Sequence, residues 1–285
     1  MFLARPLITL LAVFGLCLPL TAEENRQPVI SIIIDDIGYR LHEDLRAIGL
    51  PGQVAFAIMP HSPHAGKMSA LANELGKDVL LHLPMQATAD EKNRFLGPGA
   101  LTLEMTRAEF IQALDGNLAS VPHATGVNNH MGSLLTRHPG HMGWLMESLK
   151  SRKKFYLDSV TSNQSVAFSM ARELQVPHLK RDVFLDNIQR DEEIEAQFKE
   201  LITIAKRKGL AIAIGHPYPE TMSVLSRNLL LLDNFGVKLI SPREMLARKK
   251  ARQAKKLSSE NQAGLATLVA RSQPQNSRTY TTQNP

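Results

Sequence analysis

The fold is decided by one stretch, Val29-Ile30-Ser31-Ile32-Ile33-Ile34-Asp35-Asp36-Ile37-Gly38. Its apolar and mostly β-branched run predicts a strand that is buried on both faces, as in a parallel sheet. The glycine after the two acids predicts a turn where the strand ends. In open α/β sheets and α/β barrels, functional residues gather at the carboxyl ends of such strands.

The adjacent acids Asp35 and Asp36 allow two interpretations. Two neighbouring carboxylates repel each other, so a cation or several hydrogen bonds must be close if both are to stay ionised. A metal ion would do this by using one Asp as a ligand and leaving the other as a base. The structural alternative is that one of them caps a following helix by accepting hydrogen bonds from its free N–H groups.

The N-terminus has the features of a secretory signal peptide. Arg5 precedes an apolar run from Leu7 to Leu20, and Thr21-Ala22 is followed by polar residues. This pattern predicts cleavage after Ala22, and the run is short for a membrane-spanning helix. We therefore expect residues 1–22 to be a signal peptide, with no stable membrane anchor after cleavage and a periplasmic location for the mature chain.

The only cysteine, Cys17, lies inside this predicted signal peptide. The mature chain then has no disulfide and no thiolate ligand. Any metal site must use histidine and carboxylate side chains.

The formal net charge of +6 is unevenly distributed. Eight basic residues and the single acid Glu260 follow from Arg248 onward, and Arg5 leaves with the predicted signal peptide. The body at 23–247 is therefore close to neutral, with a net charge of −2. Because the basic residues lie in a tail, nucleic-acid binding is disfavoured as the main function.

Strand-like and helix-like segments alternate along this body. Strands are expected at 29–37, 53–59, 78–83, 126–133, 154–159, 183–186, 210–216 and 237–241, and helices at 41–48, 65–76, 106–120, 141–151, 165–174, 191–208 and 242–249. This alternation predicts an α/β fold with mostly parallel strands, and seven or eight strands favour a barrel. We expect one domain at 23–247 and a basic, polar, disordered tail at 248–285.

Polar residues follow the ends of most predicted strands. They are Asp35 and Asp36, His82, His130, Asp158, Asp186 and His216. In a parallel barrel these ends share one rim, so the side chains are expected to converge there. Nitrogen and oxygen ligands of this kind suit Zn²⁺, with Mn²⁺, Co²⁺ or Ni²⁺ as alternatives. His61 and His64 are rival ligands, although Pro60 and Pro63 place them in a loop.

Five motifs resemble the divergent polysaccharide deacetylase family, which is related to the chitin and peptidoglycan deacetylases. They are Ile34-Asp35-Asp36-Ile37-Gly38, Leu81-His82-Leu83-Pro84-Met85, Asn129-His130-Met131-Gly132-Ser133, Leu157-Asp158-Ser159 and Gly215-His216-Pro217. The resemblance covers Val29 to Leu246. It implies a distorted (β/α) barrel and a metal-dependent hydrolase that removes N-acetyl groups from the sugars of a polysaccharide or peptidoglycan.

The resemblance also implies roles for the site residues. In the related enzymes the first Asp of the pair is the base, the second binds the metal, and two histidines four residues apart complete the site. Here Gln86 stands four residues after His82. We therefore expect His130 to supply the missing ligand, beside Asp36 and His82. Asp35 is expected to act as base and His216 as acid.

Two further expectations concern the neighbourhood of these residues. Asp158 should orient His216 or a metal ligand. Ser133, or the N–H groups around Gly132, could stabilise an oxyanion. The alternative function is a catalytically weak or inactive periplasmic protein that binds carbohydrate, or acts as a scaffold, on the same barrel.

Overall fold

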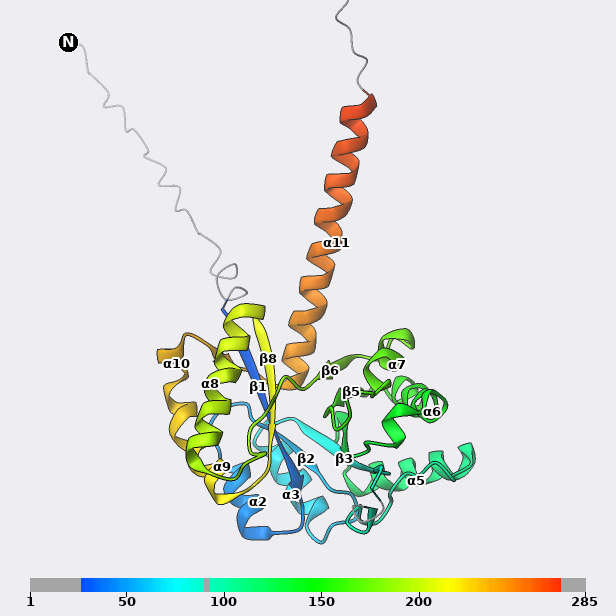
Figure 1. Cartoon of the computed structure of the whole chain (residues 1–285), viewed down its shortest axis with the longest axis vertical. Coiled ribbons are helices and arrows are strands. Elements are labelled where there is room, and N and C mark those ends of the chain that lie inside the picture. Colours follow the sequence, from blue (N-terminus) through cyan, green and yellow to red (C-terminus); the bar gives the residue numbers. More distant parts are fainter. Residues whose placement is uncertain (1–26, 90–92, 273–285) are drawn as a thin grey trace, which may run out of the picture.

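The computed structural model describes residues 27–89 and 93–272 (Figure 1). The predicted signal peptide lies outside the described residues. The strands are β1 (Val29–Ile37), β2 (Ala55–Ile58), β3 (Val79–Met85), β4 (Gly126–Met131), β5 (Phe155–Asp158), β6 (His178–Lys180), β7 (Val183–Phe184), β8 (Leu210–Gly215) and β9 (Lys238–Leu239). The helices are α2 (Leu41–Ile48), α3 (Ala65–Glu74), α5 (Arg107–Ser120), α6 (Pro139–Ser151), α7 (Ala167–Glu173), α8 (Asp191–Lys208), α9 (Pro219–Asn228), α10 (Leu232–Phe235) and α11 (Pro242–Ser272).

The strands form one parallel sheet that curls into a distorted barrel, as the sequence predicts. Their order is β6-β5-β4-β3-β2-β1-β8-β7, with β9 paired to the start of β1. The two edge strands, β6 and β7, are consecutive in the chain and are joined only by Arg181 and Asp182. The Arg181 N–H donates to Asp158 O and the Asp182 N–H donates to Ile212 O, so this short link brings the two edges together.

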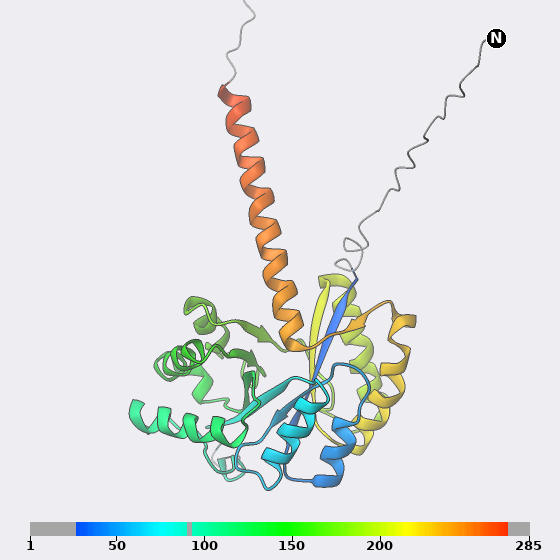
Figure 2. The same ribbon diagram turned by 180° about the vertical axis from the view of Figure 1, so that it is seen from behind.

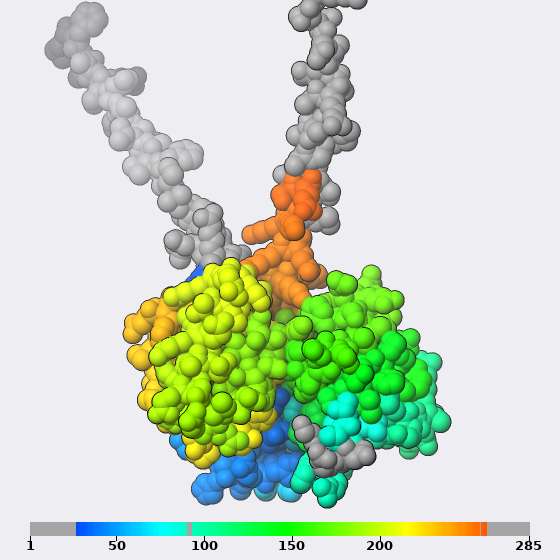
Figure 3. Space-filling model, viewed as in Figure 1, coloured from blue at the N-terminus to red at the C-terminus, as the bar shows by residue number. Residues whose placement is uncertain are grey.

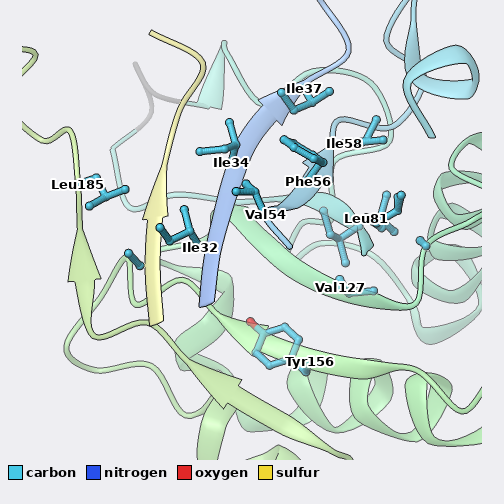
Figure 4. Packing of buried hydrophobic residues seen from close by; sticks show 14 of the residues in the cluster. Ile32, Ile34, Ile37, Val54, Phe56, Ile58, Leu81, Val127, Tyr156 and Leu185 are labelled. Atoms are coloured by element: carbon cyan, nitrogen blue, oxygen red, sulfur yellow. The ribbon is translucent and has the colours of Figure 1, made fainter. Parts of the chain in front are cut away.

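Strand β1 lies in the middle of the sheet and is buried on both faces. Ile30, Ile32 and Ile34 belong to the large apolar cluster beneath the surrounding helices, part of which is shown in Figure 4. Val29 and Ile33 belong to a smaller cluster within the curl of the sheet. This alternation follows from the two-residue period of a strand. Because neither face meets water, the run is apolar except at the buried Ser31 until the strand approaches its end.

Helices cover the outside of the curled sheet in both views (Figures 1 and 2). Helix α5 starts with a capping box, since Thr106 Oγ1 accepts from the Glu109 N–H and the Glu109 carboxylate accepts from the Thr106 N–H. Helix α8 ends at Gly209, whose left-handed φ of 81° suits a residue without a side chain. Strand β6 and helix α9 were not expected from the sequence.

Helix α11 differs from the expectation of a disordered tail. It was expected to end near Lys249, but it continues to Ser272 and projects away from the barrel (Figures 1 and 2). The reason is intrinsic helix propensity, because this segment is rich in Ala, Lys, Arg, Gln and Leu and contains no proline. Among the described residues, no helix is both long enough and apolar enough to span a membrane.

The first turns of α11 beyond Ala247 contact the barrel. Lys249 Nζ donates to His178 O over 3.1 Å, and Arg252 Nη2 donates to Gly209 O over 3.3 Å.

We expect a chain that ends after Lys256 to keep the melting temperature of the longer chain. A chain that ends after Ala247 should lose about 1 kcal/mol with these bonds, which lowers the melting temperature by ~2–4 °C. Thermal unfolding by circular dichroism checks this, and equal drops in both truncations would contradict it.

Candidate metal centre

The backbone at Asp36 turns both acids of β1 toward the same site. Adjacent residues of a regular strand point to opposite faces. Here the pairing of β1 with β2 is irregular between Ile34 and Ile37, and Asp36 has a left-handed φ of 59°. As in a β-bulge, one extra residue shifts the alternation, so Ile37 packs on the same side as Ile34. Asp35 keeps the inward direction of Ile33, and Asp36 is turned to join it.

Three ligand atoms from β1, β3 and β4 form a nearly equilateral triangle. Asp36 Oδ1 lies 3.2 Å from His82 Nε2 and 3.1 Å from His130 Nδ1, and the two ring nitrogens are 3.1 Å apart. His82 is buried, and the His130 side chain is only 14% exposed. Among the described residues, this is the one group of three or more His, Cys, Asp or Glu whose ligand atoms converge.

The triangle fits a divalent metal. Tetrahedral or octahedral coordination at the bond lengths of Zn²⁺ places neighbouring ligand atoms ~3.0–3.4 Å apart, which matches the three separations. Asp36 Oδ1 is also a buried oxygen whose near polar neighbours are the ring nitrogens of His82 and His130, and such an atom is costly unless a cation or a donor meets it. Two imidazoles and a carboxylate are a donor set typical of zinc.

The buried Asn128 determines which nitrogen of His82 can bind a metal. Asn128 Nδ2 donates to Asp35 Oδ1 over 2.8 Å, so its carbonyl oxygen faces His82 Nδ1 at 2.9 Å. An amide oxygen only accepts, and His82 Nδ1 must therefore carry a hydrogen. This leaves the lone pair of His82 Nε2 directed at the triangle, which is the arrangement that an outer hydrogen bond gives to a metal ligand.

Asp35 lies beside the triangle and is 3% exposed. One of its carboxylate oxygens is 3.6 Å from His82 Nε2. Burial raises the pKa of Asp35, with the neighbouring Asp36 acting in the same direction and His82, His216 and the Asn128 hydrogen bond opposing them. A carboxylate with a raised pKa is a stronger base than an ordinary surface acid.

His216 enters from the end of β8 and is held by Asp186. The ring nitrogen Nδ1 of His216 lies 2.9 Å from Asp186 Oδ1. The backbone N–H of His216 donates to Asp186 Oδ2 over 2.5 Å. Burial alone would lower the pKa of His216, but Asp186 and the carboxylates of Asp36 and Asp35 raise it to about 9. The imidazole is therefore protonated at neutral pH, and its Nε2 faces Asp36 Oδ2 at 3.8 Å.

Asp158 does not orient His216, contrary to the sequence-based expectation. Its carboxylate accepts from the Val160 N–H over 2.9 Å and from Ser165 Oγ over 3.0 Å. The two-residue period explains the difference. Tyr156 of the same strand packs toward the helices, so Asp158 has that direction too, whereas Asp186 shares the inward direction of Phe184.

The rival histidines lie apart from the triangle. His61 Nε2 is 3.0 Å from Asn117 Oδ1, and His64 precedes the first residue of α3. Gln86, which stands where related enzymes have a histidine, accepts from the Leu103 N–H through Oε1 over 2.8 Å. Ser133, an expected oxyanion donor, is hydrogen-bonded to Thr88.

A groove with a volume of about 970 Å³ opens above the triangle. Asp35, His82, His130 and His216 line its base, and α8 contributes one wall. Figure 3 shows the hollow between the α8 side of the barrel and the side that carries α6 and α7. Its volume lies within the range of small-molecule and cofactor sites.

Residues 32–246 match the divergent polysaccharide deacetylase family. The chain belongs to this family. It is 38% identical over 198 residues to the protein YibQ of Escherichia coli, a match that covers 70% of this chain and 61% of that protein. It is 39% identical over 203 residues to a protein of Haemophilus influenzae, covering 71% of each chain.

Two solved structures share the fold. A protein of Agrobacterium tumefaciens superposes with a TM-score of 0.73 at 22% identity, covering 76% of this chain and 88% of that one. A variant of the peptidoglycan deacetylase PdaC from Bacillus subtilis superposes with a TM-score of 0.51 at 11% identity, covering 83% and 98%. At these sequence identities, the similarity to the two structures shows a shared fold alone.

We expect the chain to bind one divalent metal per molecule through Asp36, His82 and His130. Replacing all three with Ala should abolish stoichiometric zinc binding, because each side chain supplies one corner of the triangle. Elemental analysis after reconstitution and desalting measures this. His61→Ala with His64→Ala is the matched control, and it should keep a full complement of zinc. Unchanged zinc binding in the triple variant would contradict the assignment.

We also expect Asp186, and not Asp158, to keep His216 charged. Asp186→Asn should bring the pKa of His216 down from about 9 toward its ordinary value, because the carboxylate beside Nδ1 is lost. Asp158→Asn should leave the pKa of His216 unchanged. Titration of the His216 ring signals by NMR in metal-free protein distinguishes the two variants. A larger shift in Asp158→Asn would contradict the assignment.

Proposed function

We propose that this family member is a metal-dependent N-deacetylase that acts on an N-acetylated glycan of the cell envelope, either a polysaccharide or peptidoglycan. One observation carries the proposal. A buried carboxylate and a protonated imidazole, Asp35 and His216, flank a triangle of metal-ligand atoms at the base of an open groove. Carbohydrate binding alone requires neither a base nor an acid.

Asp36, His82 and His130 would hold the metal, with Zn²⁺ as the best fit and Mn²⁺, Co²⁺ or Ni²⁺ as alternatives. When bound, a divalent metal supplies polarisation of the acetamide carbonyl and acidification of water. Asp36 suits an anionic ligand, because the imidazoles of His130 and His82 outweigh burial and hold the pKa of Asp36 well below its usual range.

The two remaining groups divide the proton transfers between them. Asp35 accepts the proton of the attacking water at the carboxylate oxygen that does not bond to Asn128. His216 donates its Nε2 proton to the nitrogen of the departing amino sugar. Asp186 keeps His216 positively charged until that transfer. A base with a raised pKa and an acid with a pKa of about 9 are suitably tuned for this division at neutral pH.

The proposed substrate and location rest on the groove and on the N-terminal sequence. The groove is open to solvent and offers polar side chains such as Thr88, Ser133 and Asn187, which suit hydroxylated sugars. The predicted signal peptide supports a periplasmic location, where N-acetylated glycans occur. We infer that the mature enzyme reaches the glycan as a soluble periplasmic protein.

Substitution of the two adjacent acids tests the mechanism. Asp35→Asn should lower acetate release by about 100-fold or more while zinc stays bound, because the base is lost and the ligands remain. Asp36→Asn should lower both acetate release and zinc content, because the anionic ligand is lost. Acetate is measured with N-acetylglucosamine oligomers and with peptidoglycan fragments, and zinc is measured on the same samples.

Asp233→Asn is the matched control, because Asp233 is an exposed carboxylate on α10, away from the groove. It should behave as wild type in both measurements. If the wild-type protein releases no acetate with any of the four metals, the deacetylase proposal fails and the alternative of a carbohydrate-binding protein replaces it. Equal loss of zinc in both Asp variants would show that the roles of the pair are wrongly assigned.

A further inference from the structure

A second cavity lies at the opposite end of the barrel from the metal centre. Its volume is about 800 Å³. It is lined by residues at the starts of β4, β5 and β6 and by the first turns of α11. Figure 1 shows α11 leaving the barrel at the end where β1 begins, whereas the metal centre lies where the strands finish.

The lining of this cavity is strongly basic. Its charged side chains are Arg152, Lys153, Lys154, Arg243, Lys249 and Lys250, and no carboxylate lines it. Two of these six side chains form ion pairs with carboxylates that do not line the cavity. Arg152 pairs with Asp115, and Arg243 Nε pairs with Asp78 Oδ1 at 2.5 Å. Within the part of the chain that the structure describes, none of the four lysines pairs with a carboxylate.

Two of these lysines are partly buried. Lys154 Nζ donates to Ala124 O over 2.5 Å, and Lys249 Nζ donates to His178 O over 3.1 Å. Burial lowers the pKa of both amines. Lys249 Nζ also lies 5.4 Å from the centre of the Phe168 ring. A partly desolvated cation that has no anionic partner is unfavourable, and a bound anion would relieve this cost. The local excess of four positive charges favours a dianion over a single carboxylate.

The inner surface of the cavity is apolar. Phe155 is 4% exposed and Val176 is 1% exposed, and Pro177 and Leu246 lie beside them in the lining. Basic side chains around an apolar surface are complementary to a ligand with a charged end and an apolar body. We propose that this cavity binds a phosphate monoester that carries an apolar substituent. This inference is independent of the proposed deacetylase activity, because the two sites share no residue.

Binding of phenyl phosphate to the full mature chain tests the proposal. Isothermal titration calorimetry should show saturable binding that is the same with metal-loaded and EDTA-treated protein. Inorganic phosphate should bind several-fold more weakly because it lacks the apolar body, and phenol should not bind measurably. Replacing Lys153→Ala and Lys250→Ala together should weaken phenyl phosphate binding by at least about tenfold. Both side chains are on the surface, so the fold should tolerate the change.

The matched control removes the same charge elsewhere, through Lys67→Ala and Lys206→Ala on the outer helices α3 and α8. It should leave the affinity unchanged. Equal weakening in both double variants would show general electrostatic attraction and overturn the proposal. The proposal would also be overturned by no saturable binding, by binding that EDTA abolishes, or by equal affinity for inorganic phosphate. Sedimentation with phosphatidylglycerol vesicles without phenyl phosphate binding would instead show a membrane-binding surface.

Discussion

The left-handed backbone at Asp36 is the constraint on which the site depends. A regular strand would place Asp35 and Asp36 on opposite faces of the sheet, one in the groove and one beneath the helices. The irregular pairing between β1 and β2 brings both carboxylates to the same side. A non-glycine residue with this φ is strained by about 1 kcal/mol or more, so the surrounding contacts must hold it there. The strain therefore coincides with the residue proposed to bind metal.

Buried hydrogen-bond partners then give two similar histidine side chains different chemical roles. Asn128 links His82 to Asp35 and directs one nitrogen of His82 into the triangle of ligand atoms. Asp186 holds His216 in its charged form next to Asp36. One histidine is thus prepared to give a lone pair, and the other is prepared to give a proton. The metal centre and the acid–base pair are two consequences of the same arrangement of strand ends.

The sequence predicted the barrel and most of the residues at its rim. Long apolar runs leading into Asp or His indicated Asp35, Asp36, His82 and His216. The strand before His130 has a weaker signal, and the metal-ligand role of His130 was inferred from the family resemblance. The partner of His216 was wrongly predicted, although the alternation along β7 points to Asp186 and the alternation along β5 excludes Asp158.

Other features could not be read from the sequence, for physical reasons. The bulge at Asp36 arises from the pairing of β1 with β2, a separate segment of the chain, and no local pattern around Asp36 encodes it. The tail was predicted from its polarity to be disordered, but polarity does not oppose a helix whose residues have high intrinsic propensity. Helix α11 illustrates this as far as Ser272, where the described residues end.

The most direct test of the account is anomalous X-ray diffraction from crystals of the mature protein grown with zinc. The account predicts one strong peak within about 2.0–2.2 Å of Asp36 Oδ1, His82 Nε2 and His130 Nδ1, with Asp35 outside bonding distance of it. A peak that is bound by His61 or His64 would contradict the account. So would a crystal with fully occupied zinc sites elsewhere and none at this triangle.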